Sequence, residues 1–105
     1  MKANIEMEIE VKMGKADLAG TGLAGYMPDG TTYKQLVKVF GKPQHGVASP
    51  DGKVQVEWTG RINGLDFSIY DYKNDCKPQA NTEWHIGGRG KMLVSLLTTY
   101  FNASK

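Results

Sequence analysis

The chain has 105 residues, a formal net charge of +2 from 13 basic and 11 acidic side chains, and a single cysteine. This length suits one domain, residues 1–105, with one modest core. The small charge gives no argument for direct DNA binding, and a lone cysteine excludes an internal disulfide or a cysteine-rich metal site. No apolar run approaches the roughly 20 residues of a membrane span, so we expect a cytoplasmic protein, or a viral protein acting in a bacterial host's cytoplasm. Glycine is unusual, because its 13 residues are about twice the average usage.

The N-terminal third combines a strand pattern with a glycine-rich segment. Residues 5–13 alternate apolar and polar side chains, which predicts a strand with one buried and one acidic face. Residues 14–30 are rich in glycine and lack periodicity, which predicts a long irregular loop, either simply flexible or able to close over a ligand. Gly20–Gly25 matches G-x-G-x-x-G, but Pro28 interrupts the chain where a dinucleotide-binding fold needs a helix. We therefore disfavour a Rossmann domain.

A hairpin is predicted in the middle of the chain. Residues 44–52 form an expected loop, and strand alternation begins at Val54. Asn63-Gly64 is the favoured pair for a two-residue type I′ turn before the returning strand. That turn sets a register in which apolar side chains face each other and opposite charges meet. The expected cross-strand pairs are Ile62–Leu65, Arg61–Asp66, Thr59–Ser68, Trp58–Ile69 and Glu57–Tyr70.

Two helices complete the expected fold. Apolar residues at helical spacing predict a helix from Thr31 or Thr32 to Phe40, and a second from about Lys91 to Phe101. A short strand is expected at 83–86, between a polar loop and the second helix. The order of elements indicates an α+β domain, in which two helices pack on one face of an antiparallel sheet of about four strands.

The first candidate site lies where the last strand meets the last helix. We expect Gly87 and Gly88 to form a turn there, with Arg89 and Lys91 at the opening of the helix. Exposed backbone N–H groups, the positive end of the helix dipole and two cations favour an anion such as a phosphate. The alternative interpretation is an ordinary strand-to-helix turn with solvated cations.

Aromatic side chains form the second candidate site. Tyr70 and Tyr72 share a strand face with Glu57, and Tyr26 ends the glycine-rich segment. Exposed aromatic rings beside Arg or Lys can stack on a base or another planar group. The alternative is that these are ordinary sheet tyrosines, or that they pack against another subunit.

No catalytic or metal-binding group is evident. His85 occupies the opposite strand face from Trp84 and Ile86, and such a histidine is more often a structural residue than a catalytic base. Cys76 lies in a polar loop without an accompanying motif. We therefore expect no enzyme, no metal and no cofactor.

Four motifs in order resemble a known family. They cover about residues 31–90 and read Tyr33-x-x-Leu36-x-x-Val39-Phe40-Gly41-x-Pro43, Asp51-Gly52-Lys53-Val54-x-Val56-Glu57-Trp58, Ile69-Tyr70-Asp71-Tyr72-Lys73 and Glu83-Trp84-His85-Ile86-Gly87-Gly88. Together they resemble the first described family of phage anti-Thoeris sponge proteins. The resemblance implies a non-enzymatic anti-defence protein that binds cyclic ADP-ribose isomers intact, at sites between the subunits of a homo-oligomer, from a dimer up to a hexamer. In some members it also implies binding of cyclic oligonucleotides at a separate site.

Three functions follow as hypotheses. The first is sequestration of a cyclic ADP-ribose isomer or related cyclic nucleotide, with ligand contacts drawn from Tyr26, Tyr70, Tyr72, Trp84, His85, Gly87, Gly88, Arg89 and Lys91. The second is a protein–protein inhibitor of a host defence complex such as CRISPR or restriction machinery, suggested by the small size and the acidic strand face. The third is an enzyme that cleaves a cyclic nucleotide with His85 as base.

Overall fold

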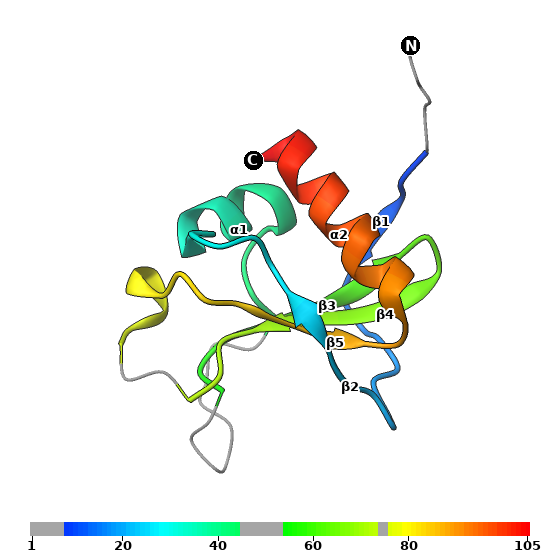
Figure 1. Ribbon diagram of the computed structural model, residues 1–105, viewed down its shortest axis with the longest axis horizontal. Coiled ribbons are helices and arrows are strands. Elements are labelled where there is room, and N and C mark those ends of the chain that lie inside the picture. The colour runs from blue at the N-terminus through cyan, green and yellow to red at the C-terminus, as the bar shows by residue number, and fades with distance from the viewer. Residues whose placement is uncertain (1–7, 45–53, 74–75) are drawn as a thin grey trace.

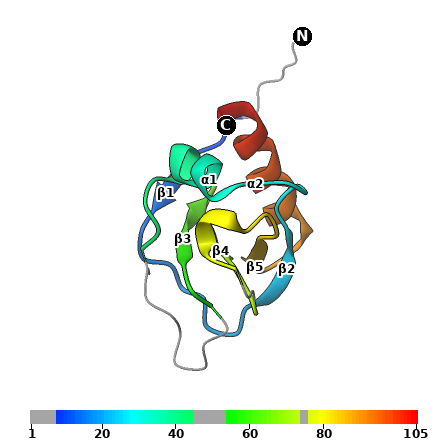
Figure 2. The same cartoon turned by 90° about the vertical axis from the view of Figure 1, so that its left-hand side faces the viewer.

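One five-stranded antiparallel sheet carries two helices on the same face (Figures 1 and 2). The computed structural model describes residues 8–44, 54–73 and 76–105. The strands lie in the order β1-β3-β4-β5-β2, so the first two strands of the chain form opposite edges. The elements are β1 Val11–Met13, β2 Gly22–Tyr26, α1 Tyr33–Phe40, β3 Glu57–Ile62, β4 Leu65–Tyr70, a 3-10 turn Pro78–Ala80, β5 His85–Gly88 and α2 Lys91–Ser104. The α+β prediction is confirmed, with five strands instead of about four.

The helices begin and pack as their sequences predict. Thr32 caps α1 through a capping box with Gln35, in which each side chain binds the other's backbone N–H at 3.0–3.1 Å. Helix α1 buries Leu36 and Phe40 on the inner face of the sheet. Helix α2 runs three residues further than expected and adds Leu93, Leu96, Leu97 and Phe101 to the same core. Full burial of each such side chain contributes about 1.5–3 kcal/mol to stability.

The central hairpin adopts the predicted register. All five expected pairs are present, from Ile62 opposite Leu65 to Glu57 opposite Tyr70. Asn63 and Gly64 have φ angles of 48° and 81°, as a type I′ turn requires. The Asn63 side chain also accepts a hydrogen bond from the Glu10 backbone N–H at 2.8 Å. The turn therefore holds the chain on the N-terminal side of β1.

Other boundaries differ from the sequence prediction. Strand β1 comprises only the last part of the expected 5–13, of which residues 5–7 lie outside the described chain. Residues 45–53, most of the expected loop 44–52, lie outside it too. Strand β3 begins three residues later than predicted, because the Asp71 carboxylate binds the backbone N–H groups of Gln55 and Val56 at 2.8 and 3.1 Å. Among the described helices, none is long and apolar enough to cross a membrane.

The prediction of an irregular loop throughout 14–30 is wrong, because Gly22–Tyr26 forms the edge strand β2. A bulge between Leu23 and Gly25 disrupts the alternation that would have revealed it. Gly25 is required there, since a Cβ atom would lie 2.8 Å from Val94 of α2. Gly20–Gly25 therefore enters an antiparallel edge strand, which excludes the Rossmann interpretation.

Residues 14–21, here termed the crossing segment, connect β1 to β2 across the outer face of the sheet (Figure 2). Gly14 exchanges hydrogen bonds with Thr59, and the Asp17 backbone N–H donates to Asp66. Strand alternation places Thr59 of β3 and Asp66 of β4 on the outer face of the sheet, away from the core. The crossing segment therefore covers one end of the outer face, and the other end is open to the candidate site.

Candidate functional site: an aromatic pocket on the outer face

Three adjacent strands place one ring each in a row across the open end of the outer face. Tyr70 of β4 and Tyr26 of β2 are both the direct partners of His85 on β5. Because directly opposite residues of an antiparallel pair point to the same face, the three side chains stand side by side. Tyr72 follows the end of β4, and its ring centroid lies 6.4 Å from that of Tyr70. The sheet register thus brings together three of the nine predicted ligand contacts, and Tyr72 adds a fourth.

The imidazole of His85 lies at the centre of these rings. Its centroid is 5.4 Å from that of Tyr70, with an interplanar angle of 20° that corresponds to stacking. Tyr26 lies 5.0 Å away at 55°, and Tyr72 lies 5.5 Å away at 62°. These separations fall within the 4.5–7 Å range of favourable aromatic pairs. The cluster is therefore a packed platform and not four independent side chains.

An open pocket of about 390 Å³ adjoins this platform. We call it the aromatic pocket; it is lined by Leu23, Tyr26, Tyr70, Tyr72 and His85. Gly87 lies beside it on β5, where a Cβ atom would be 2.5 Å from the Ser68 hydroxyl and 3.3 Å from the Tyr70 ring. Because Gly87 has no side chain, the Tyr70 ring can lie close to β5.

Burial governs the ionisation of the pocket. It lowers the pKa of His85 below its ordinary value of 6.5, although Glu83 and Asp71 favour the charged form. Burial, and to a smaller degree the Glu57 carboxylate, raises the pKa of Tyr70. The imidazole and the phenol are thus both neutral at pH 7. The pocket presents uncharged rings, which suit a planar ligand group.

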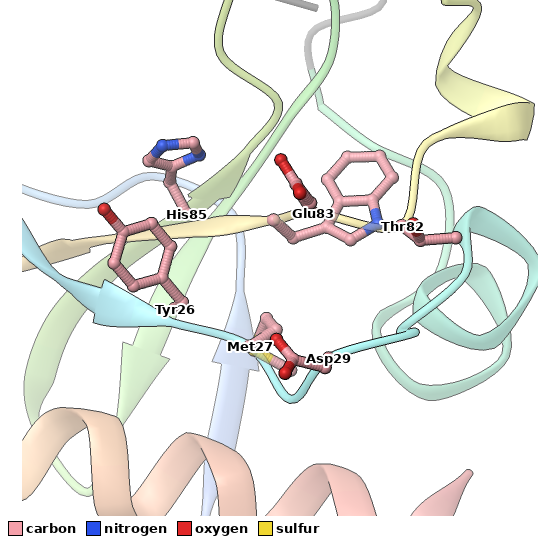
Figure 3. Close-up of a pocket in the computed structure, with 7 residues that line it drawn as sticks. Tyr26, Met27, Asp29, Thr82, Glu83 and His85 are labelled. Atoms are coloured by element: carbon pink, nitrogen blue, oxygen red, sulfur yellow. The ribbon is translucent and has the colours of Figure 1, made fainter.

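A second pocket of about 330 Å³ shares the Tyr26 and His85 wall (Figure 3). Asp29, Thr82 and Glu83 supply its polar lining. Figure 3 shows Tyr26 and His85 standing side by side, with Met27 and Asp29 on the chain segment that follows Tyr26. Two carboxylates, Asp29 and Glu83, line this pocket, so electrostatic repulsion disfavours the binding of a phosphate there.

Trp84 packs in the core and borders the second pocket, so it is not an exposed stacking platform. It is 1% exposed, and its indole N–H donates to the Thr31 carbonyl at 3.0 Å. Its ring meets that of Trp58 edge-on at 5.5 Å. Because Trp84 alternates with His85 along the chain, the position that aims His85 outward aims Trp84 into the core.

The predicted glycine turn at Gly87 and Gly88 is also wrong. Both residues are buried in β5, hydrogen-bonded between β4 and β2, so their backbone groups do not form an open anion site. Gly88 has a φ angle of 153°, and a Cβ atom there would lie 2.2 Å from Leu93. The Leu93 side chain of α2 thus fills the space that a side chain at Gly88 would occupy.

The predicted cations Arg89 and Lys91 lie at the opposite end of β5 from His85. Arg89 is four positions along the extended chain from His85, a separation of about 13 Å. The Arg89 guanidinium donates a hydrogen bond to the Ala19 carbonyl in the crossing segment. The structure therefore separates the two halves of the predicted site, and Arg89 already has an internal partner.

Sequence reasoning missed two contributors. Leu23 lines the aromatic pocket, and the bulge in β2 concealed that Leu23 and Tyr26 share a face. Asp71 is fully buried and anchors the chain between Tyr70 and Tyr72 through the two N–H groups described above. Cys76 is exposed, and within the described residues no cluster of three His, Cys, Asp or Glu side chains could hold a metal ion.

No family model matches the chain, and neither a curated protein nor a solved structure matches it. The resemblance to anti-Thoeris sponges therefore rests on the four sequence motifs. Any function attached to the aromatic pocket has to be argued from its own chemistry.

Proposed function

We propose that the protein is a non-catalytic binding protein that sequesters a nucleotide signal of the cyclic ADP-ribose class in the cytoplasm of a bacterial host. The observation that carries this proposal is the row of Tyr26, Tyr70, Tyr72 and His85 around an open pocket. A purine base is planar and aromatic, and stacking on such side chains contributes about 1–3 kcal/mol per base. The four sequence motifs, which include three of these residues, support the same ligand class.

The charged part of the ligand needs a cation near the rings. Lys73 supports this requirement, because its ammonium group lies 5.4 Å from the centroid of the Tyr72 ring. Arg89 and Lys91 are too far along β5 to contact a group bound at His85. We therefore assign the base to the rings and the nearest phosphate to Lys73, and we assign no direct ligand contact to Arg89.

Inhibition of a host defence complex through protein–protein contact is the second candidate, and one observation favours it. Leu23 and Tyr26 are 54% and 56% exposed on the edge strand β2. Apolar side chains on a sheet edge favour pairing with another chain, either a host protein or a second copy. A homo-oligomer, from a dimer to a hexamer, would place this edge against its own copy.

Ligand-dependent thermal stability separates these possibilities. A ligand that binds only the folded state stabilises it by about 2.7 kcal/mol at 100 times the Kd. We expect a cyclic ADP-ribose isomer to raise the Tm of the full chain, and to be recovered intact after heat denaturation. No shift with any isomer contradicts the proposal, and recovery of a cleaved product would instead indicate an enzyme.

Two exposed apolar residues provide a matched pair of variants. Tyr26→Ala removes a ring of the pocket, whereas Met92→Ala removes a 64% exposed side chain on α2 that does not line it. We expect a loss of affinity of at least about tenfold for Tyr26→Ala, from the lost stacking, and none for Met92→Ala. Retention of a host protein by the wild type but not by Tyr26→Ala, without ligand binding, would favour the second candidate.

A further inference from the structure

The imidazole of His85 is enclosed by three tyrosine rings, and this limits how it can meet a ligand. Tyr70 stacks on one face of it, while Tyr26 and Tyr72 approach at steep angles. The Tyr70 ring therefore covers one face of the imidazole. A ligand in the aromatic pocket can meet the imidazole at its edge, where a nitrogen atom can form a hydrogen bond.

The two imidazole nitrogens differ in their surroundings. Nδ1 is buried and has no hydrogen-bond partner among the residues that the structure describes. A neutral histidine carries one proton, on either Nδ1 or Nε2. A buried N–H without an acceptor is rarer and costs more than a buried lone pair without a donor. The proton therefore favours Nε2.

We infer that His85 is the residue that selects the ligand's base, because its Nε2–H is a hydrogen-bond donor that requires an acceptor opposite it, such as a ring nitrogen of a purine. This inference rests on the proposed function. A purine has such acceptors on its edges, whereas an ammonium or another N–H donor would leave the Nε2 proton unpaired. A buried donor left unpaired costs the ligand most of its affinity.

The geometry of Tyr26 is compatible with this contact. A base lying flat on the exposed Tyr26 ring is inclined by about the same 55° to the imidazole, so it cannot stack on both rings. It therefore presents its edge to His85. The rings thus provide affinity for any flat group, while His85 distinguishes acceptors from donors.

The tautomer can be measured without any ligand. In 15N NMR spectra of the full-length protein at pH 7, a protonated and an unprotonated imidazole nitrogen have well-separated chemical shifts. We expect Nδ1 of His85 to be unprotonated and Nε2 to carry the proton. His85→Phe assigns the signals, because His45 is the other histidine in the chain. A proton on Nδ1 overturns the inference whether or not a nucleotide binds.

Two substitutions then test the donor in binding. His85→Phe keeps a ring among the tyrosines but has no donor, whereas His85→Gln places an amide N–H near the position of Nε2. With cyclic ADP-ribose isomers as probes, we expect about tenfold weaker binding for His85→Phe and partial recovery for His85→Gln. Tm without ligand controls for folding. Equal affinity of His85→Phe and the wild type overturns the inference but leaves the proposed function standing, whereas a wild type that binds no isomer refutes the proposed function alone.

Discussion

The two ends of the outer sheet face differ in whether their polar groups are already occupied. At the covered end, Arg61 binds Asp66 at 2.7 Å, Asp66 also accepts from Asp17, and Arg89 donates to Ala19. At the open end, the side chains contact one another through aromatic rings, and Nδ1 of His85 has no partner within the described residues. Both ends lie on the same strands, β4 and β5.

At the covered end, the crossing segment takes up the hydrogen-bonding groups that an external ligand would otherwise bind. It supplies the backbone groups that Thr59, Asp66 and Arg89 bind, so an external anion would have to displace it. Ser68 and Thr59 are buried although they belong to the outer face. Within the described residues, no segment covers the open end in this way, which leaves flat apolar area and hydrogen-bonding capacity for an external molecule.

The largest expected effect is a loss of stability, and it distinguishes Gly88 from Gly87, the two glycines of β5. Gly88→Ala places a methyl group 2.2 Å from Leu93 and imposes a φ of 153° on a residue with a side chain. We expect the free energy of unfolding to fall by about 3 kcal/mol, from overpacking and backbone strain. Gly87→Ala meets a hydroxyl that can rotate, so its cost should be about 1 kcal/mol. Urea denaturation measures both, and equal losses would show that α2 does not pack against Gly88.

The second prediction compares the ends in ligand binding. Gly87→Ala adds a methyl group beside Tyr70 next to the aromatic pocket, and it should weaken binding of a cyclic ADP-ribose isomer about tenfold. Arg89→Ala, at the covered end, should change affinity by less than about threefold, because its guanidinium binds Ala19. Isothermal titration calorimetry gives both values. A larger loss of affinity for Arg89→Ala than for Gly87→Ala would indicate that the ligand binds at the covered end, as the sequence motif alone suggested.

Local signals predicted most of the fold. The helix start at Thr31 or Thr32, the apolar stripes of both helices and the Asn63-Gly64 turn each depend on a few neighbouring residues, and all three are present. Strand β2 could not be predicted in this way. Its evidence in sequence is weak because its pairing with β5 spans about 60 residues, and a bulge breaks its alternation.

Some residues of the candidate site were predicted from the sequence, but their arrangement was not. Tyr26, Tyr70, Tyr72 and His85 were named from the sequence, and only the sheet register brings them together. Gly87 and Gly88 were misinterpreted because glycine suits both a turn and a strand under close packing. A single sequence does not distinguish these two uses, since the atoms that a Cβ would meet belong to β4 and α2.

A third prediction uses pH to report on the open end. Because the pKa of folded His85 lies below 6.5, the unfolded chain binds its proton first as pH decreases. Stability should therefore fall as pH drops through about 6.5 and level off below the folded pKa. His85→Phe should reduce this decrease in a series of urea titrations between pH 8 and pH 5. An unchanged pH dependence would mean that the imidazole is not buried among the tyrosines.

The smallest expected effect belongs to the covered end and lies in a lower pH range. The hydrogen bond from Arg61, followed by that from the Asp17 backbone N–H, lowers the pKa of Asp66 below 3.8. The folded state therefore gains stability from ionised Asp66 above about pH 4, and it loses that stability as pH falls through the lowered pKa. Both charged groups are accessible to solvent, so the effect should be small and weaker at high salt. Asp66→Asn should reduce the loss of stability below pH 4 and leave the loss near pH 6.5 unchanged. His85→Phe should reduce the loss near pH 6.5 and leave the one below pH 4 unchanged. A variant that altered both losses would show that the crossing segment and the aromatic pocket are coupled and not independent.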